Sequence, residues 1–227
     1  MIDYIIDFPE AARVDRIIPK TKIYEKAGAT NRVRNLFVRE IEQIRWLYKL
    51  SPETVNLKAT KSVQEIQVFQ LVLKQDLKSD DVLMSIDATI PSPILFILER
   101  DEQIRYCACY KRPSLVDQKK WVTSEYFKTA WISSTAKHRS LPVVVSLKAL
   151  HDHFLRGLIP IEIWDDENID QLVQRAETLR IKEREFERLE ARLQKERQFN
   201  RKVEINSELR LISTEIDSLK YTSKANL

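Results

Sequence analysis

Apolar residues in the last quarter of the chain recur at the spacing of a helix. A first set runs from Ile169 to Leu193, and a second runs from Ile205 to Leu219 in steps of four, three, four and three residues. The second set has the heptad spacing of a coiled-coil seam. Between the two sets the phase slips, which indicates either a stutter in one long helix or the corner of a helical hairpin. No Gly, Pro, Asp or Ser lies at the slip, so the pattern favours one continuous helix.

This helical segment is densely charged. Residues 166–220 carry 13 acidic and 12 basic side chains and contain no Gly, Pro, Cys or Trp. A charged helix with a narrow apolar seam needs a partner helix, which can come from this chain, a second copy or another protein. We therefore expect a coiled-coil tail at 165–220 and a disordered end at 221–227. The expected interaction face comprises Leu172, Leu179, Phe186, Phe199, Ile205, Leu209, Ile212 and Ile216.

Residues 1–164 mix helix-like and strand-like patterns. They predict an α+β body, in which a small, mostly antiparallel sheet is flanked by helices. Apolar residues at helical spacing run from Val33 to Tyr48, and both faces of the segment 65–74 are apolar, as in an interior strand. The further predicted elements are a helix from Ser79 to before Pro91, a hairpin at 94–99 and 104–110, a strand at 126–132, and a helix at 146–156 closed by Gly157.

The chain has only two glycines, Gly28 and Gly157, among 227 residues. Average usage is about 7%. Dinucleotide fingerprints, phosphate-binding P-loops and nucleophile elbows each need clustered glycines. The composition therefore excludes these three kinds of enzyme site.

Other features of the composition favour the cytoplasm. The longest apolar run, 94–98, is far shorter than the ~20 residues of a membrane span, and the first residues show no signal-peptide pattern. Two cysteines, Cys107 and Cys109, cannot build a disulfide framework, which is typical of a reducing compartment. A net charge of +4 is compatible with nucleic acid but does not require it.

Four side chains suggest zinc only superficially. Cys107 and Cys109 fall two apart on a predicted strand, so both thiols face one side. His151 and His153 fall two apart on a predicted helix, where their rings point about 200° apart. Neither spacing is that of structural zinc sites. We expect two core thiols, two surface histidines, and no metal or cofactor.

Three polar residues, Glu53, Glu65 and Gln67, can be compared with the metal-binding pattern of a nuclease. Restriction-type nucleases hold a metal with one acidic residue and an acid-x-Lys pair on a strand. Here Glu65 and Gln67 lie on the predicted strand and Glu53 precedes it, but glutamine replaces the lysine and cannot supply its charge. The same objection applies to Asp87 with residues 99–101. Strand-edge polar residues are the alternative interpretation, and catalytic residues stay unknown.

Basic and aromatic residues are interleaved between residues 105 and 139. Cations and aromatic rings on one sheet face can neutralise and stack single-stranded nucleic acid. The alternative is that the aromatic residues pack the core and the lysines solvate the strands. The nucleic-acid-binding residues expected from this pattern are Arg105, Lys111, Arg112, Lys119, Lys120, Trp121, Lys128 and Trp131.

Several blocks together resemble the bacterial domain of unknown function 4391 family. They are IIPK at 17–20, YEK at 24–26, WLYKLSPET at 46–54, EIQVF at 65–69, IDATIP at 86–91, PILFI at 93–97 and ERQFNRKVE at 196–204. The resemblance covers nearly the whole chain and carries no catalytic signature. It implies a gene neighbourhood that includes a helicase and a DNA methyltransferase, in restriction-like or phage-defence systems.

Taken together, the patterns favour an accessory binding subunit. Its body would dock on a helicase or methyltransferase partner, or on DNA, while its tail would give dimerisation or assembly. The block 198–202 is either a docking surface or a polar position that sets helix register. A degenerate metal-dependent nuclease and a purely structural homodimer are the alternatives.

Overall fold

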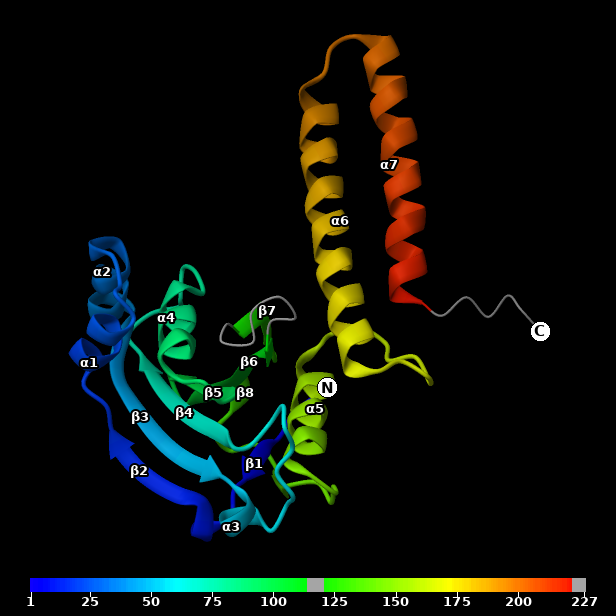
Figure 1. Ribbon diagram of the computed structural model, residues 1–227. Helices are drawn as coiled ribbons and strands as arrows, with labels where there is room; N and C mark the ends of the chain where they lie inside the picture. Colours follow the sequence, from blue (N-terminus) through cyan, green and yellow to red (C-terminus); the bar gives the residue numbers. More distant parts are fainter. Residues whose placement is uncertain (114–120, 222–227) are drawn as a thin grey trace. The chain divides into compact units, whose positions relative to one another are not determined.

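The computed structural model describes residues 1–113 and 121–221, and the chain divides into two compact units (Figure 1). The first unit is Met1–Pro160 and the second begins at Ile161. The body was expected to end at Trp164. Lys119 and Lys120 lie outside the described residues, and so does the expected disordered end, apart from Tyr221.

A seven-stranded sheet forms the centre of the first unit. The strands follow the order β2-β3-β4-β5-β6-β7, with β8 paired to β6, and among these pairs β4 and β5 are parallel while the others are antiparallel. The expected mixed fold with a mostly antiparallel sheet is therefore confirmed. The strands are β2 (Arg13–Ile17), β3 (Ile41–Leu50), β4 (Ile66–Leu73), β5 (Ile94–Arg100), β6 (Gln103–Pro113), β7 (Trp121–Lys128) and β8 (Ile132–Ser133).

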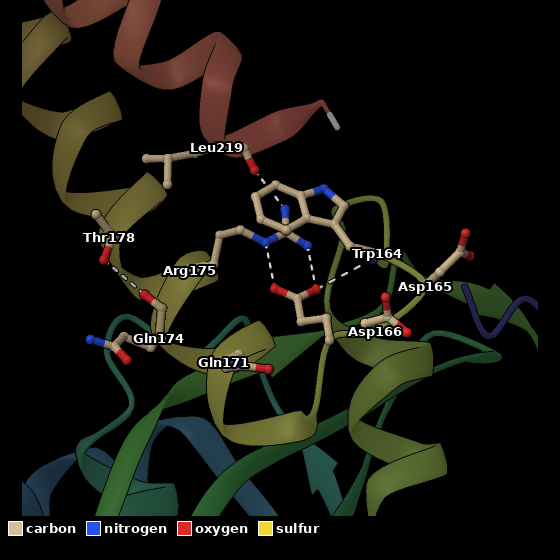
Figure 2. Close-up of a pocket in the computed structure, with 9 residues that line it drawn as sticks. Trp164, Asp165, Asp166, Gln171, Gln174, Arg175, Thr178 and Leu219 are labelled. Atoms are coloured by element: carbon tan, nitrogen blue, oxygen red, sulfur yellow. Dashed lines mark hydrogen bonds and ion pairs between the residues drawn. The ribbon is translucent and has the colours of Figure 1, made fainter. Parts of the chain in front are cut away.

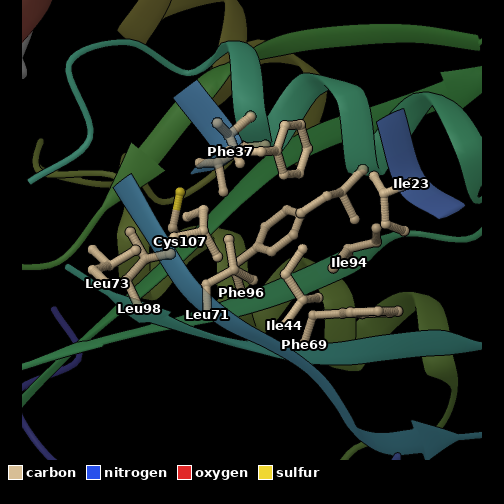
Figure 3. Close-up of a cluster of buried hydrophobic side chains, with 14 of the residues drawn as sticks. Ile23, Phe37, Ile44, Phe69, Leu71, Leu73, Ile94, Phe96, Leu98 and Cys107 are labelled. Atoms are coloured by element: carbon tan, nitrogen blue, oxygen red, sulfur yellow. The ribbon is translucent and has the colours of Figure 1, made fainter. Parts of the chain in front are cut away.

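Three helices cover one face of this sheet and one helix covers the other. Helices α1, α2 and α4 share a hydrophobic core with alternate residues of the central strands, among them Phe69, Phe96 and Cys107 (Figure 3). On the opposite face, the His151 ring of α5 stacks on Tyr110, the strand neighbour of Cys109. The helices are α1 (Lys20–Lys26), α2 (Asn31–Glu40), α3 (Pro52–Val55), α4 (Asp81–Thr89) and α5 (Leu147–Leu158), and a 3-10 turn η1 (Glu10–Ala12) precedes β2.

The N-terminal residues pair with the end of the first unit. Strands β1 (Ile5–Asp7) and β9 (His138–Ser140) form a separate parallel pair, and the Ile2 amide donates to the Gly157 carbonyl at 3.0 Å. Gly157 was expected to cap α5, but it lies inside that helix. A Cβ at this position would come within 2.6 Å of Ile2 Cγ1, so glycine is needed here for close packing rather than for helix termination.

Strand pairing confirms two of the predicted features and corrects a third. The strand expected at 65–74 is confirmed as β4, between β3 and β5, and the expected hairpin is confirmed as β5 and β6, turning through Asp101 and Glu102 at positive φ. The helix expected to reach Tyr48 is wrong beyond Glu40. Residues 41–50 pair with β4 instead, because strand pairing outweighs a helical spacing that continued by coincidence.

The second unit is a helical hairpin of α6 (Ile169–Lys195) and α7 (Phe199–Lys220). The two helices run antiparallel and pack on one another (Figure 1). The C-terminal helical segment is thus confirmed, but the favoured continuous helix is wrong, because the backbone becomes extended at Glu196 and Gln198. Within the residues that the structure describes, no helix is both long enough and apolar enough to cross a membrane.

Candidate functional site

A buried arginine organises the base of the helical hairpin (Figure 2). Arg175 of α6 donates from Nε and Nη2 to the two carboxylate oxygens of Glu167 at 2.6 and 2.7 Å, and both side chains are buried. The guanidinium carbon lies 3.9 Å from the centroid of the Trp164 ring. The remaining donors reach the carbonyls of Glu162 and Leu219, each at 2.6 Å. One side chain therefore joins the segment before α6, α6 itself and the end of α7.

This base borders a cavity of about 720 Å³. Its charged wall is the Arg175–Glu167 pair, in which the carboxylate neutralises the guanidinium and four hydrogen bonds hold it. Trp164, Asp165 and Asp166 form part of the rim. Because Glu167 already pairs with the guanidinium, the site does not attract an anion, and the arrangement serves chiefly to hold the hairpin.

The expected interaction residues divide between the inside and the outside of the hairpin. Two ion pairs join the helices beside the seam, Lys182 to Glu215 and Lys220 to Glu183, both at 2.7 Å. The seam therefore has a partner helix from this chain. Leu172, Leu179, Ile205, Leu209 and Ile212 are buried, Phe186 and Ile216 are partly buried, and Phe199 is exposed.

The hairpin turn is held by a carboxylate rather than by glycine or proline. Glu196 Oε1 accepts hydrogen bonds from the amides of Arg197 and Gln198 at 2.8 and 2.9 Å. These bonds hold the pKa of the Glu196 carboxyl below its ordinary value. They also give these two amides a side-chain acceptor in place of the carbonyls that a continuing helix would provide. Sequence patterns missed the turn because glutamate is a common helix residue, and the phase slip was its one visible signal.

The tip beyond this turn presents an aromatic ring among cations. Phe199 is 77% exposed, and Val203 one turn later is 49% exposed. Residues 188–202 carry six basic and two acidic side chains, a local net charge of +4 that equals the net charge of the whole chain. The formal charges of the remaining residues sum to zero, although residues 13–49 also carry a local excess, with ten basic and four acidic side chains. The basic side chains are Arg188, Arg192, Lys195, Arg197, Arg201 and Lys202.

The residues expected to bind nucleic acid in the first unit lie at two separate places on the sheet. Arg105 stacks on Trp131 at 4.7 Å near the start of β6, whereas Lys111 lies 5.8 Å from the Trp121 ring near its end. Between these places, the face carries Cys107, Cys109 and Tyr126, which lie in the core beneath α4. No continuous stacking surface runs along this part of the described sheet. Lys128 pairs with Asp80, Arg112 is partly exposed, and the binding role of the set stays a prediction.

Lys111 belongs to a buried polar network. Its Nζ donates to the carbonyls of Asp87, at 2.8 Å, and Ile90, and lies 3.4 Å from Asp87 Oδ1. Asp87 Oδ2 accepts from Cys109 Sγ at 3.2 Å and from the Tyr126 hydroxyl. The network closes the C-terminal end of α4 onto β6 and β7. A cavity of about 500 Å³ lies beside it, with Trp121 and Thr123 in its wall.

The four side chains considered for zinc lie on different faces. Cys107 and Cys109 are buried free thiols on the same face, and burial raises the pKa of both. His151 is buried rather than on the surface, and burial lowers its pKa to about 4, whereas His153 is exposed. Across residues 1–113 and 121–221, no three His, Cys, Asp or Glu side chains come together as a metal site.

The three nuclease candidates lie where β3 ends and β4 begins. Glu53 and Glu65 line one cavity of about 540 Å³, and Gln67 donates to Glu65 Oε1 at 2.8 Å. Lys49 of β3 is the Cα partner of Gln67 in the sheet, and its Nζ lies 2.8 Å from Glu65 Oε2. The positive charge that the Glu-x-Gln pattern lacks is therefore present on the neighbouring strand.

Comparison with known proteins places the chain in a family. Residues 6–216 match the family described as Domain of unknown function (DUF4391). The chain belongs to the DUF4391 family. No curated protein and no solved structure matches it.

The DUF4391 match covers both units. It begins within β1 and ends within α7, so the seven-stranded sheet, Arg175 with Glu167, and the tip all lie within the matched region. The family description names no activity, substrate or partner. Roles for the residues of this DUF4391 protein therefore rest on their geometry and chemistry.

Proposed function

We propose that this DUF4391 protein is an accessory interaction subunit that docks on a macromolecular partner through the tip of its helical hairpin. The observation that carries this proposal is the exposed Phe199 ring within the basic tip at 188–202. Exposed aromatic residues are typical anchors of protein interfaces, and surrounding cations steer a complementary acidic surface into place.

The hairpin suits this role because hydrogen bonds order its base, while its tip exposes an aromatic side chain. At the base, Arg175 uses its donors on Glu167 and two backbone carbonyls, which orders the hairpin at its start. At the far end, Glu196 shapes the turn and leaves the Phe199 side chain in solvent. A preordered tip loses less conformational entropy on binding than a flexible segment would.

The proposed partner is a helicase or DNA methyltransferase subunit of a restriction-like defence system in the cytoplasm. Nucleic acid bound by such a partner would add phosphates that the tip cations attract. In the first unit, Arg112 is partly exposed and Trp121 is exposed, and these two members of the nucleic-acid set would provide a second contact.

Self-association through a coiled coil is a further part of the proposal. Ile181 and Leu211 are large apolar residues that stay exposed on α6 and α7 after the two helices pair. A second hairpin would cover them. Light scattering on the full chain tests this, with Ile181→Glu expected to reduce a dimer to a monomer.

The test of docking uses co-purification of the tagged full-length protein with its neighbouring helicase and methyltransferase. Phe199→Ala and the double variant Arg201→Glu, Lys202→Glu are expected to lose the partner identified by mass spectrometry. Val38→Ala, which truncates an apolar side chain that is 57% exposed on α2, is the control and is expected to retain it. Unchanged recovery with both tip variants would contradict the proposal.

Nucleic-acid binding has its own measurement. A labelled oligonucleotide is titrated at about 50 and 200 mM salt, where four tip phosphate contacts would weaken duplex binding about 10²-fold. The charge-reversed tip is expected to remove most of this salt dependence. A wild-type protein that binds no oligonucleotide at the lower salt would limit the tip to protein partners.

A further inference from the structure

The ends of β3 and β4 bring together the elements of a cation and phosphate site. Lys49 lies opposite Gln67 in the strand register, and Glu65 immediately precedes β4. Helix α3 follows β3 after Ser51, which places Glu53 on the wall of the cavity that Lys49 and Glu65 also line. This position is independent of the hairpin tip.

The two carboxylate oxygens of Glu65 have different hydrogen-bond and ion-pair partners. Oε2 lies 2.8 Å from Lys49 Nζ, and Oε1 accepts from Gln67 Nε2 at 2.8 Å and from Ser92 Oγ at 3.0 Å. Burial raises the pKa of the Glu65 carboxyl, but the hydrogen bonds from Lys49 and Ser92 outweigh it, and the pKa is lowered overall. The carboxylate is therefore ionised near neutral pH and has neutral polar groups on the side of Oε1.

Gln67 carries the observation that points to a ligand. Its side chain is 4% exposed, and its buried Oε1 atom has no hydrogen-bond partner among the described residues. An unsatisfied buried carbonyl oxygen costs free energy unless a donor or a cation binds it. The amide presents Nε2 to Glu65, so in this orientation the spare oxygen lies on the other side of the amide from the carboxylate.

A half-turn of this amide would exchange its nitrogen and oxygen. Gln67 Oε1 would then occupy the place of Nε2, 2.8 Å from Glu65 Oε1. Adjacent ligand oxygens of an octahedral Mg²⁺ at 2.0–2.1 Å are about 2.9 Å apart. After this half-turn the carboxylate and the amide oxygen would be spaced as neighbouring ligands of such a cation, which would satisfy the turned oxygen, and Nε2 would take the place that Oε1 occupies now.

The remaining wall suits a phosphate group. Glu53 has its pKa lowered by a hydrogen bond from Ser51 at 2.6 Å and supplies a second carboxylate. Lys61 and Thr60 line the same cavity, together with Lys49. Mg²⁺ is commonly held by one or two carboxylates and by the phosphates of its substrate, rather than by a complete protein cage.

We propose that Glu65, Gln67 and Glu53 bind a divalent cation of the Mg²⁺ class, and that Lys49 and Lys61 hold a nucleic-acid phosphate against it. The lysine that the Glu-x-Gln pattern lacks is supplied by β3. The site binds a phosphodiester group in a cation-dependent way, with Gln67 as the ligand that changes orientation when the cation enters.

The first experiment measures Mn²⁺ binding to the full-length protein by electron paramagnetic resonance. Glu65→Gln is expected to weaken binding at least tenfold, and Gln67→Leu to weaken it too. Gln67→Glu adds a charged ligand and is expected to tighten binding, an outcome that misfolding cannot imitate. Glu99→Gln, which changes a carboxylate on β5 that binds Gln70, is the control and should leave Mn²⁺ affinity unchanged. Equal affinity in wild type, Glu65→Gln and Gln67→Glu would overturn the proposal.

The second experiment adds a short single-stranded oligonucleotide. The wild-type protein is expected to bind Mn²⁺ more tightly in its presence, and Lys49→Gln with Lys61→Gln should abolish this gain. No gain in wild type would overturn the phosphate part. Phe199→Ala is expected to leave both measurements unchanged, which separates this site from docking through the tip.

Discussion

The Arg175 guanidinium stacks on the Trp164 ring at 3.9 Å while it forms a two-point ion pair with Glu167. The stack and the ion pair use different surfaces of one planar group, its face and its edge. A lysine ammonium has neither the plane nor the fork, so it cannot replace both contacts. The base of the hairpin therefore depends on arginine in particular.

Replacing Arg175 should destabilise the hairpin strongly. Arg175→Ala leaves the buried Glu167 carboxylate without its partner, and breaking a buried pair in this way costs about 3–5 kcal/mol. Arg175→Lys is expected to recover only part of this. Hydrogen exchange of α6 and α7 amides measures the loss, and Arg210→Ala on an exposed position should change stability by no more than about 0.5 kcal/mol.

The buried His151 should make stability depend on pH between about 6.5 and 4. Burial, with a smaller effect of Lys148, lowers the pKa of this imidazole to about 4, so the folded protein keeps it neutral. Below about pH 6.5 the unfolded chain binds the proton more readily, and stability falls as pH falls, by up to about 1.4 kcal/mol per unit.

The measurement for His151 is urea unfolding at several pH values. His151→Phe retains a ring beside Tyr110 and removes the titrating group, so its stability should decline less from pH 7 to pH 5 than that of wild type. The titration of carboxylates contributes equally to the pH dependence of stability in wild type and in the variant. Parallel pH profiles of wild type and variant would contradict the assignment.

Gly157→Ala should destabilise the first unit through contact with Ile2. The added Cβ would meet Ile2 Cγ1 at 2.6 Å, and overpacking of this kind costs about 1–3 kcal/mol. Thermal unfolding of Gly157→Ala, Ile2→Ala and the double variant forms a cycle. The double variant should be more stable than the sum of the single effects predicts, and strict additivity would show that the two residues do not interact.

Both thiols should resist modification in the native protein. Burial raises the pKa of Cys107 and of Cys109, whose thiol also donates to Asp87, so little thiolate forms near pH 8. A chromogenic disulfide reagent is expected to modify neither cysteine until the protein is unfolded in urea, when both react. Rapid modification of one native equivalent would contradict this burial.

Sequence patterns predicted the correct element where local and tertiary preferences agreed, and the wrong element where they differed. The strand at 66–73 was predictable because it is apolar on both faces, as its position between β3 and β5 requires. The end of α2 at Glu40 was not, because Ile41 and Ile44 continue a helical spacing while their strand partners lie about thirty residues away.

The candidate sites were predictable in their parts but not in their assembly. Glu53, Glu65 and Gln67 were visible from their residue types, but Lys49 joins them only through strand register. Likewise, Phe199 was visible as an aromatic residue at a phase slip, but its exposure depends on the turn that Glu196 forms. Lys111 belonged to a plausible basic surface and is instead buried with Asp87, because a lysine can satisfy carbonyls at a helix end.

The contact of Ile2 with Gly157 brings the first and last parts of Met1–Pro160 side by side. A unit whose ends meet is suited to circular permutation, because a short linker could join those ends and new ends could be opened in a surface loop. In such a rearranged chain the hairpin could be attached at a different point, or supplied as a separate polypeptide, without removing a strand from the sheet.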